Sequence, residues 1–237
     1  MAAELRVFAD PEDLGEALAD EIRAAYEAKG STFLLGCPGG RSPRSTYRAL
    51  AAKRVDWSDL VIAMMDEYVP APPDAHYSCR RFALREIAAP LGVPDERVWL
   101  PDPADPDAYD ERIAGAGGID LFLLASGASD GHVAFIPPGS QLEGRTAVVS
   151  LAESTRRDNL ATFPEFGSVA DVPDRGVTVG LATITDARAV RLVLHGADKR
   201  AATARLLELD DFDADWPASV VHVCADAEIW VDRAALG

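Results

Sequence analysis

The sequence predicts an α/β fold, with a doubly wound, mostly parallel sheet and helices on both faces. Its strand-like segments are apolar throughout and do not alternate between apolar and polar residues, which is typical of a parallel sheet covered on both sides. Each of these segments is followed by a turn and then by helical signals. Because this order continues along all 237 residues, we expect a single domain over residues 1–237.

The first two strand-and-helix units lie in the N-terminal quarter of the chain. Residues 5–8 form an apolar strand. Residues 10–13, Asp-Pro-Glu-Asp, then supply an N-cap, a proline at the first helical position and acids in the first turn, so we expect a helix to about Gly30. A second strand at 32–37 leads through a glycine turn to a helix over 43–54.

Three later strands also lead into turns that carry glycine or polar residues. They are a strand at 60–65 before a helix near 78–89, a strand at 119–125 before the glycine-rich segment 126–131, and a strand at 191–195 whose turn at 196–199 opens a helix to about Leu209. Ligands of such sheets bind beyond the carboxyl ends of the strands. We therefore expect the functional residues in the turns.

The composition excludes several classes of protein. The chain has 23 basic and 39 acidic side chains and a formal charge of -16, so it would repel a nucleic acid. No apolar run approaches the roughly 20 residues that span a bilayer. The first residues lack the pattern of a signal peptide, so we expect no membrane role and a cytoplasmic location. The three cysteines are widely spaced, which predicts buried thiols and no disulfide framework.

The first turn, residues 36–43, is a candidate anion site. The adjacent Gly39 and Gly40 let the backbone approach a ligand, Ser42 offers a hydroxyl, and the following helix points free N–H groups at the same place. The spacing matches neither a Walker loop nor a dinucleotide fingerprint. The alternative is a tight turn with a solvated Arg41, and the turn by itself leaves both interpretations open.

The second turn places Asp66 and Glu67 directly after an apolar strand. A carboxylate that is partly shielded from water has a raised pKa and can act as a general base. The alternative is that Asp66 caps a following turn while Glu67 faces solvent. For an isolated pair of acids this structural alternative is favoured.

The third turn holds Asp130 and His132 on either side of a glycine. The carboxylate can orient the imidazole, and histidine is suited to proton transfer near neutral pH. A metal site is the competing interpretation, but no second histidine or cysteine lies at ligand spacing, so we expect no metal. His195 and His222 lie in strand-like runs and are expected to be hydrogen-bonded core or edge histidines, while His76 lies in a loop.

The fourth turn contributes Lys199, at the start of a helix after Gly196. The chain has only two other lysines, Lys29 and Lys53, so a lysine is an unusual choice here. A lysine at this place can reach a phosphate that the helix N-terminus already favours. The alternative is a solvated surface lysine.

Taken in order, these segments resemble the glucosamine-6-phosphate deaminase and 6-phosphogluconolactonase family. The resemblance runs from about residue 34 to residue 235. Its clearest pieces are MDEYV at 65–69, SDGHVAF at 129–135, PGS at 138–140 with GRT at 144–146, LAESTRRDN at 151–159, VTVG at 177–180 with DAR at 186–188, and GADK at 196–199. Each piece is weak alone, but their joint order is specific. The resemblance implies a Rossmann-like fold, a small-molecule sugar 6-phosphate as substrate, and no redox cofactor.

The resemblance also implies roles for the residues of the turns. In the deaminases, the aspartate that matches Asp66 removes the C2 proton during aldose–ketose conversion, and ammonia is released. The histidine that matches His132 opens the sugar ring and is steadied by the aspartate that matches Asp130. The loop that matches Gly39 to Ser42 and the lysine that matches Lys199 hold the phosphate.

The sequence departs from the deaminases at the residues that follow the histidine. Deaminases carry Asn-Glu-Pro there, and the glutamate completes an Asp-His-Glu relay, whereas this chain has Ile136 and Pro137. The phosphate arginine of the deaminases falls near Ala161, so Arg41 becomes a candidate to replace it from another side. Arg145 is a further candidate donor to the phosphate. We expect a deaminase or related 6-phosphosugar isomerase.

The lactonases are the alternative. They share the apolar pair after the histidine and the spacing of the first turn, but they carry an arginine where Tyr68 stands. A non-catalytic phosphosugar sensor is a further alternative, because the relay glutamate is missing. The oligomeric state, a homo-oligomer included, is left open.

Overall fold

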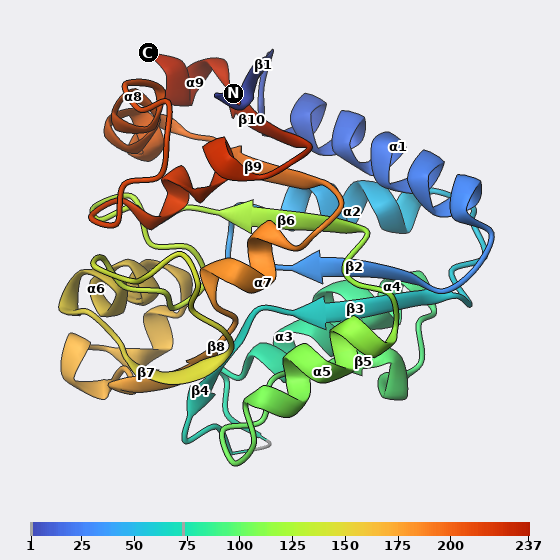
Figure 1. Cartoon of the computed structure of the whole chain (residues 1–237), viewed down its shortest axis with the longest axis horizontal. Helices are drawn as coiled ribbons and strands as arrows, with labels where there is room; N and C mark the ends of the chain where they lie inside the picture. The colour runs from blue at the N-terminus through green and yellow to red at the C-terminus, as the bar shows by residue number, and fades with distance from the viewer. Residues whose placement is uncertain (1, 73) are drawn as a thin grey trace.

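The structure is a computed structural model that describes residues 2–72 and 74–237. Its main sheet has seven strands in the order β1-β10-β9-β6-β2-β3-β5, and its strand pairs are parallel (Figure 1). The strands are β1 Glu4–Phe8, β2 Phe33–Cys37, β3 Leu60–Met64, β5 Val98–Trp99, β6 Leu121–Ala125, β9 Val190–Leu194 and β10 Ala227–Asp232. The predicted doubly wound α/β fold is confirmed.

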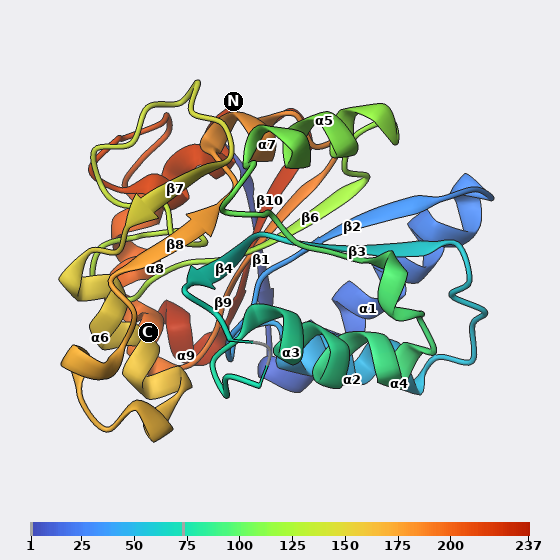
Figure 2. The same cartoon turned by 90° about the horizontal axis from the view of Figure 1, so that it is seen from below.

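Helices cover both faces of this sheet, as Figure 2 shows for α1 to α4 on one side and α5 and α7 on the other. They are α1 Pro11–Lys29, α2 Arg44–Ala52, α3 Cys79–Ala83, α4 Ala89–Leu91, α5 Asp107–Gly115, α7 Leu181–Thr185, α8 Arg200–Leu207 and α9 Arg233–Leu236. Successive strand residues point to opposite faces, so Leu34 packs with one buried cluster and Leu35 with the other. Both clusters need apolar side chains, which explains why the strands are apolar throughout.

Two expected helices show how closely local signals set the boundaries. Asp10 caps α1 by accepting a hydrogen bond from the Asp13 N–H, and Gly30 ends it in the left-handed conformation with φ 60°. The helix expected near 78–89 is present, but a π-helical segment, Leu84–Ala88, separates α3 from α4. Pro90 in α4 lacks an N–H group, and the hydrogen-bond ladder therefore shifts just before it.

A second, smaller sheet was not expected from the sequence. It is antiparallel, in the order β4-β8-β7, with β4 Asp66–Val69, β7 Ala147–Ser150 and β8 Arg175–Thr178. Since β3 ends at Met64 and β4 begins at Asp66, the chain passes from one sheet to the other at this point. Tyr68 of β4 packs against aromatic rings of the segment that follows α6 (Glu153–Thr162), which brings α6 next to the end of the main sheet.

The strand order places the functional turns together. Strands β9, β6, β2 and β3 are neighbours in the sheet, and each of the four turns described above follows the carboxyl end of one of them. The chain returns from β5 at the edge to β6 beside β2, so its direction of winding reverses between β2 and β6. Ligands bind at such a reversal. Among the described residues, no helix combines the length and the apolar character needed to cross a membrane.

Candidate active site

One cavity of about 310 Å³ lies where the four turns meet. Most of the predicted site residues line it, namely Gly39, Gly40, Arg41, Ser42, Asp66, His132 and Lys199. The turns supply these side chains from four strands, and α6 closes the cavity with Arg157, Asp158, Asn159, Ala161 and Thr162. A polar group from each turn therefore faces a shared space.

Asp66 is a buried carboxylate at the wall of this cavity. Burial raises its pKa from 3.8 to about 7, and the charge of the neighbouring Glu67 also raises it. A hydrogen bond from the Cys79 thiol to Oδ1, 3.2 Å long, works in the opposite direction, as does the charge of His132. A carboxylate with this pKa is an effective general base near neutral pH.

Glu67 is partly buried beside Asp66, and its carboxylate is directed to the start of α3. Its carboxylate accepts hydrogen bonds from the Ser78 hydroxyl at 2.8 Å and from the N–H groups of Cys79 and Arg80 at 2.9 and 3.0 Å. It therefore binds the N-terminus of α3, where Cys79 donates to Asp66. The sequence indicates the pair of acids, but it does not indicate that Asp66 lines the cavity while Glu67 binds the start of α3.

Asp130 lies behind His132, away from the cavity lining. Its Oδ1 is 2.6 Å from Nδ1 of His132 and also accepts the His132 backbone N–H. Burial alone would raise the pKa of Asp130, but the hydrogen bond and charge of the imidazole, with the Ser154 hydroxyl, hold it below its usual range. A Cβ at Gly127 would lie 2.2 Å from Nδ1, so only glycine leaves room for the ring.

The other histidines have structural partners. His195 Nε2 donates to the Ser42 carbonyl at 2.9 Å and so fixes the first turn. His222 binds the Ala3 N–H through Nδ1 and the Leu206 carbonyl through Nε2. Both are the hydrogen-bonded histidines that the sequence predicts. His76 packs against aromatic rings and is not among the residues that line the cavity.

Two cationic side chains, Arg41 and Lys199, line the cavity at the first and fourth turns. Arg41 pairs with Asp198, with 3.6 Å between Nη2 and Oδ2, and Lys199 donates from Nζ to the Ser126 carbonyl at 2.7 Å. Burial lowers the pKa of Lys199, and the charge of Asp158 opposes that shift. Gly40 has φ +86°, which favours glycine. Helix α2 begins without a side-chain cap, and its Arg44 N–H donates to the Arg41 carbonyl, so any anion here would be bound by the N–H groups that follow.

The structure places Arg145 outside the cavity, which corrects its assignment to the phosphate site. Its half-exposed guanidinium pairs with Asp186 at 2.5 Å, and it is not among the lining residues. The GRT segment resembles the family in sequence, but it lies in the loop just before β7, which is at the other edge of the small sheet from β4. Pro137 does not line the cavity either, and its carbonyl accepts the Ser140 hydroxyl.

Sequence reasoning missed the contribution of α6. The LAESTRRDN segment was recognised as a family motif, but its residues received no role. In the structure the amide Nδ2 of Asn159 is buried without a hydrogen-bond partner in the described part of the chain, and Asn159 lines the cavity. The motif itself was the signal, since it contains an unbroken polar run over residues 153–159.

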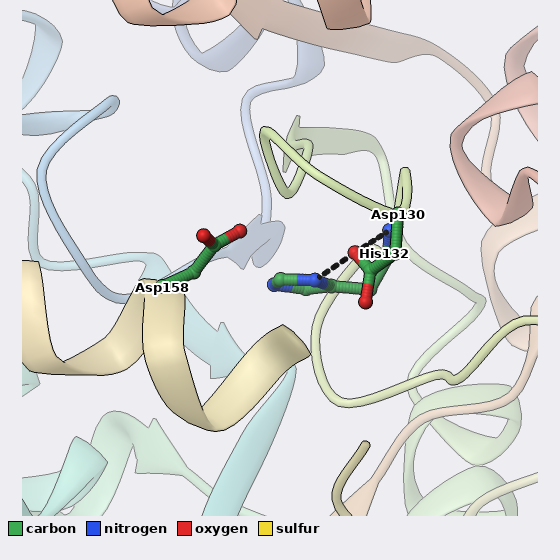
Figure 3. Close-up of side chains that lie close together, drawn as sticks. All are labelled: Asp130, His132 and Asp158. Carbon is green, nitrogen blue, oxygen red and sulfur yellow. Dashed lines mark hydrogen bonds and ion pairs between the residues drawn. The ribbon is translucent and has the colours of Figure 1, made fainter. Parts of the chain in front are cut away.

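Atoms of Asp130, His132 and Asp158 lie within 4.8 Å of one another, a spacing that can hold a metal ion (Figure 3). The 2.6 Å hydrogen bond between Asp130 and His132 already uses an atom of each. The arrangement is better suited to moving a proton through the imidazole.

The sequence matches the family described as glucosamine-6-phosphate isomerases/6-phosphogluconolactonase over residues 9–230. A glucosamine-6-phosphate deaminase from Pseudarthrobacter chlorophenolicus is 38% identical over 98% of this chain and 91% of its own length. One from Streptomyces coelicolor is 36% identical with the same coverage.

Solved structures agree with this match. A monomeric glucosamine-6-phosphate deaminase superposes with a TM-score of 0.91 at 27% identity and covers 98% of both chains. A 6-phosphogluconolactonase from Trypanosoma brucei has the same fold, with a TM-score of 0.76 at 24% identity over 98% of this chain and 97% of its own. The chain therefore belongs to the glucosamine-6-phosphate isomerase/6-phosphogluconolactonase family.

Proposed function

We propose that this chain is a glucosamine-6-phosphate deaminase, which converts the amino sugar phosphate to a ketose 6-phosphate and releases ammonia. The observation that carries the proposal is Asp66, a buried carboxylate in the cavity whose pKa burial raises to about 7. Aldose–ketose conversion needs a base that removes a proton from carbon next to a carbonyl. Lactone hydrolysis has no such step.

The residues that line the cavity supply the other groups that the reaction needs. The first turn and Lys199 bind the phosphate, and His132 donates a proton to the ring oxygen when the ring opens. Asp66 then takes the C2 proton and returns one to C1. The resulting imine at C2 is hydrolysed by water, and ammonia leaves. A sugar phosphate is a cytoplasmic metabolite, so we place the enzyme in the cytoplasm.

Named relatives support this assignment, because the deaminases from two organisms are 36–38% identical over nearly the whole chain. Asn159 adds a buried amide that has no partner among the described residues and lines the cavity, where it can bind a sugar hydroxyl.

The second candidate is 6-phosphogluconolactonase. It is favoured by Pro137, because the glutamate that the resemblance implies for deaminases is missing there. His132, held by Asp130, can activate a water for lactone hydrolysis. This candidate leaves the raised pKa of Asp66 without a use.

The test offers purified protein glucosamine 6-phosphate and, separately, freshly prepared 6-phosphogluconolactone. Ammonia and ketose phosphate are expected from the first substrate, lost in Asp66→Asn and in His132→Ala. Lactone hydrolysis that survives Asp66→Asn, with no ammonia from the amino sugar, would establish the lactonase. Binding of the phosphosugar without turnover of either would indicate a sensor.

A further inference from the structure

Asp158 lies on α6, and its carboxylate lines the cavity beside His132. A carboxylate oxygen of Asp158, a ring nitrogen of His132 and a carboxylate oxygen of Asp130 all lie within 4.8 Å of one another. Figure 3 shows Asp158 pointing toward the edge of the imidazole that faces away from Asp130. Two carboxylates therefore flank a single imidazole.

The Asp158 carboxylate is fixed in this position by the backbone of the third turn. Its Oδ2 accepts the Ala128 N–H at 3.0 Å, while Oδ1 takes no hydrogen bond from any described residue. Ser154 and Thr155 lie four and three residues earlier, on the same face of α6, and both donate to Asp130. The same face of α6 therefore carries Asp158 and binds Asp130, which fixes both carboxylates relative to the His132 ring.

The distance between Asp158 and His132 leaves room for substrate oxygens. The two side chains come within 4.8 Å of each other but do not form an ion pair, which would require 4.0 Å or less. That separation is too long for a direct hydrogen bond and leaves space for a polar atom between the two groups. The hemiacetal carbon of a sugar carries two oxygens, the C1 hydroxyl and the ring oxygen, and groups at this spacing can bind one each.

The two groups also differ in what they can do with a proton. Nδ1 of His132 is held by Asp130, so the other ring nitrogen is the one that can exchange a proton with a group in the cavity. An ionised Asp158 has only acceptor atoms. The other charged groups that line the cavity around this pair are Arg41, Asp66, Arg157, Asp198 and Lys199.

We propose that Asp158 and His132 form the base and acid that open the pyranose ring of the amino sugar, a step that rests on the proposed deaminase function. Asp158 takes the proton of the C1 hydroxyl, and the C1=O carbonyl forms as the bond from C1 to the ring oxygen breaks. The ring oxygen takes a proton from protonated His132. One proton is gained by Asp158 and one is lost by His132, so no other reactant is needed. Asp66 then receives an open-chain aldehyde.

Ring opening can be measured apart from the later steps in the Asp66→Asn background, because that variant cannot remove the C2 proton. The assay follows exchange between the α and β anomers of glucosamine 6-phosphate by NMR. Asp66→Asn is expected to speed the exchange above its rate in buffer. Adding Asp158→Asn is expected to reduce the enzyme-dependent rate about 100-fold, the usual size of a general-base contribution.

Two controls separate catalysis from binding and folding. Glu153→Gln, added to Asp66→Asn, makes the same change of charge on the same helix, at an exposed residue that does not line the cavity, and should leave the exchange rate unchanged. The second control is the affinity for the open-chain amino alditol 6-phosphate, which cannot close a ring. Asp158→Asn should change this affinity less than threefold. An equal loss of alditol binding would make Asp158 a general binding residue and overturn the proposal.

The remaining outcomes are also decisive. Anomer exchange that is equally fast with and without Asp158→Asn refutes the base assignment. So does the absence of any acceleration by Asp66→Asn when the wild type releases ammonia. If the wild type releases no ammonia but anomer exchange still depends on Asp158, the ring-opening role stands and the proposed deaminase function fails.

Discussion

Replacing Asp66 by asparagine should stabilise the protein while removing the base. Burial raises the pKa of Asp66 from 3.8 to about 7, so the folded protein binds this proton more tightly than the unfolded chain does. Between these two pH values the folded state holds one more proton, and the free energy of unfolding therefore falls as the pH rises. Above pH 7 the full cost of the buried charge is present. This cost to the free energy of unfolding is about 4 kcal/mol, from three pKa units at about 1.4 kcal/mol each.

The magnitude can be tested by urea unfolding of the wild type and Asp66→Asn at pH 5 and pH 8. The variant should be the more stable protein, and the difference should grow by about 2 to 3 kcal/mol between the two pH values. Other titrating groups are shared by both proteins and cancel in the difference. The Cys79 thiol can still donate to the asparagine oxygen, so this contact is kept.

The same residue predicts the pH dependence of the proposed reaction. A base works only when deprotonated, so kcat/KM for ammonia release should rise as the pH passes through about 7 and should be nearly lost in Asp66→Asn. A stability difference that does not change between pH 5 and pH 8 would refute the reasoning, because it would mean that Asp66 titrates alike in the folded and unfolded states.

Three further predictions concern the remaining parts of the site. Lys199→Gln should raise KM for the phosphosugar about 10- to 100-fold, because a charged hydrogen bond to phosphate is lost. Lys53→Gln, at the end of α2, is the control and should leave KM unchanged. If the two variants have equal KM values, Lys199 does not bind the phosphate. Gly127→Ala should abolish ammonia release, because the new Cβ would lie 2.2 Å from the imidazole of His132. Gly115→Ala is the control and should retain full activity, because its Cβ would meet no atom within 4 Å. Arg145→Ala should change KM less than twofold, and a larger increase would return this residue to the site.

The parts of the fold that the sequence predicts well are those set by local chemistry. The first helix needs only Asp10, its proline and Gly30, all neighbours of the helix itself. The strands of the main sheet are buried on both faces, so their apolar runs stand out. The small sheet escaped prediction because β7 is four partly exposed residues, without the apolar run or clear alternation that marks a strand.

The candidate site also has a part that the sequence predicts and a part that depends on packing. The residues predicted in the turns lie in one cavity because strand polarity and strand order bring the turns to one edge of the sheet. Arg145 was assigned on motif resemblance alone, and its side chain is directed to Asp186. Asp158 was missed because a single aspartate in a helical motif gives no sign of which loop its helix packs against.

By itself the sequence determined the α/β class, the turns that carry the chemistry and the family, because these depend on local patterns and their order along the chain. The tertiary structure decided which charged side chains lie close together. Asp66 acquires its raised pKa mainly from burial in the folded chain. Asp158 lies near His132 because α6 packs beside the third turn, where the Ala128 N–H binds its carboxylate, and the rings around Tyr68 hold the segment after α6 against β4. Contacts between residues far apart in sequence depend on packing, and packing is a property of the whole chain.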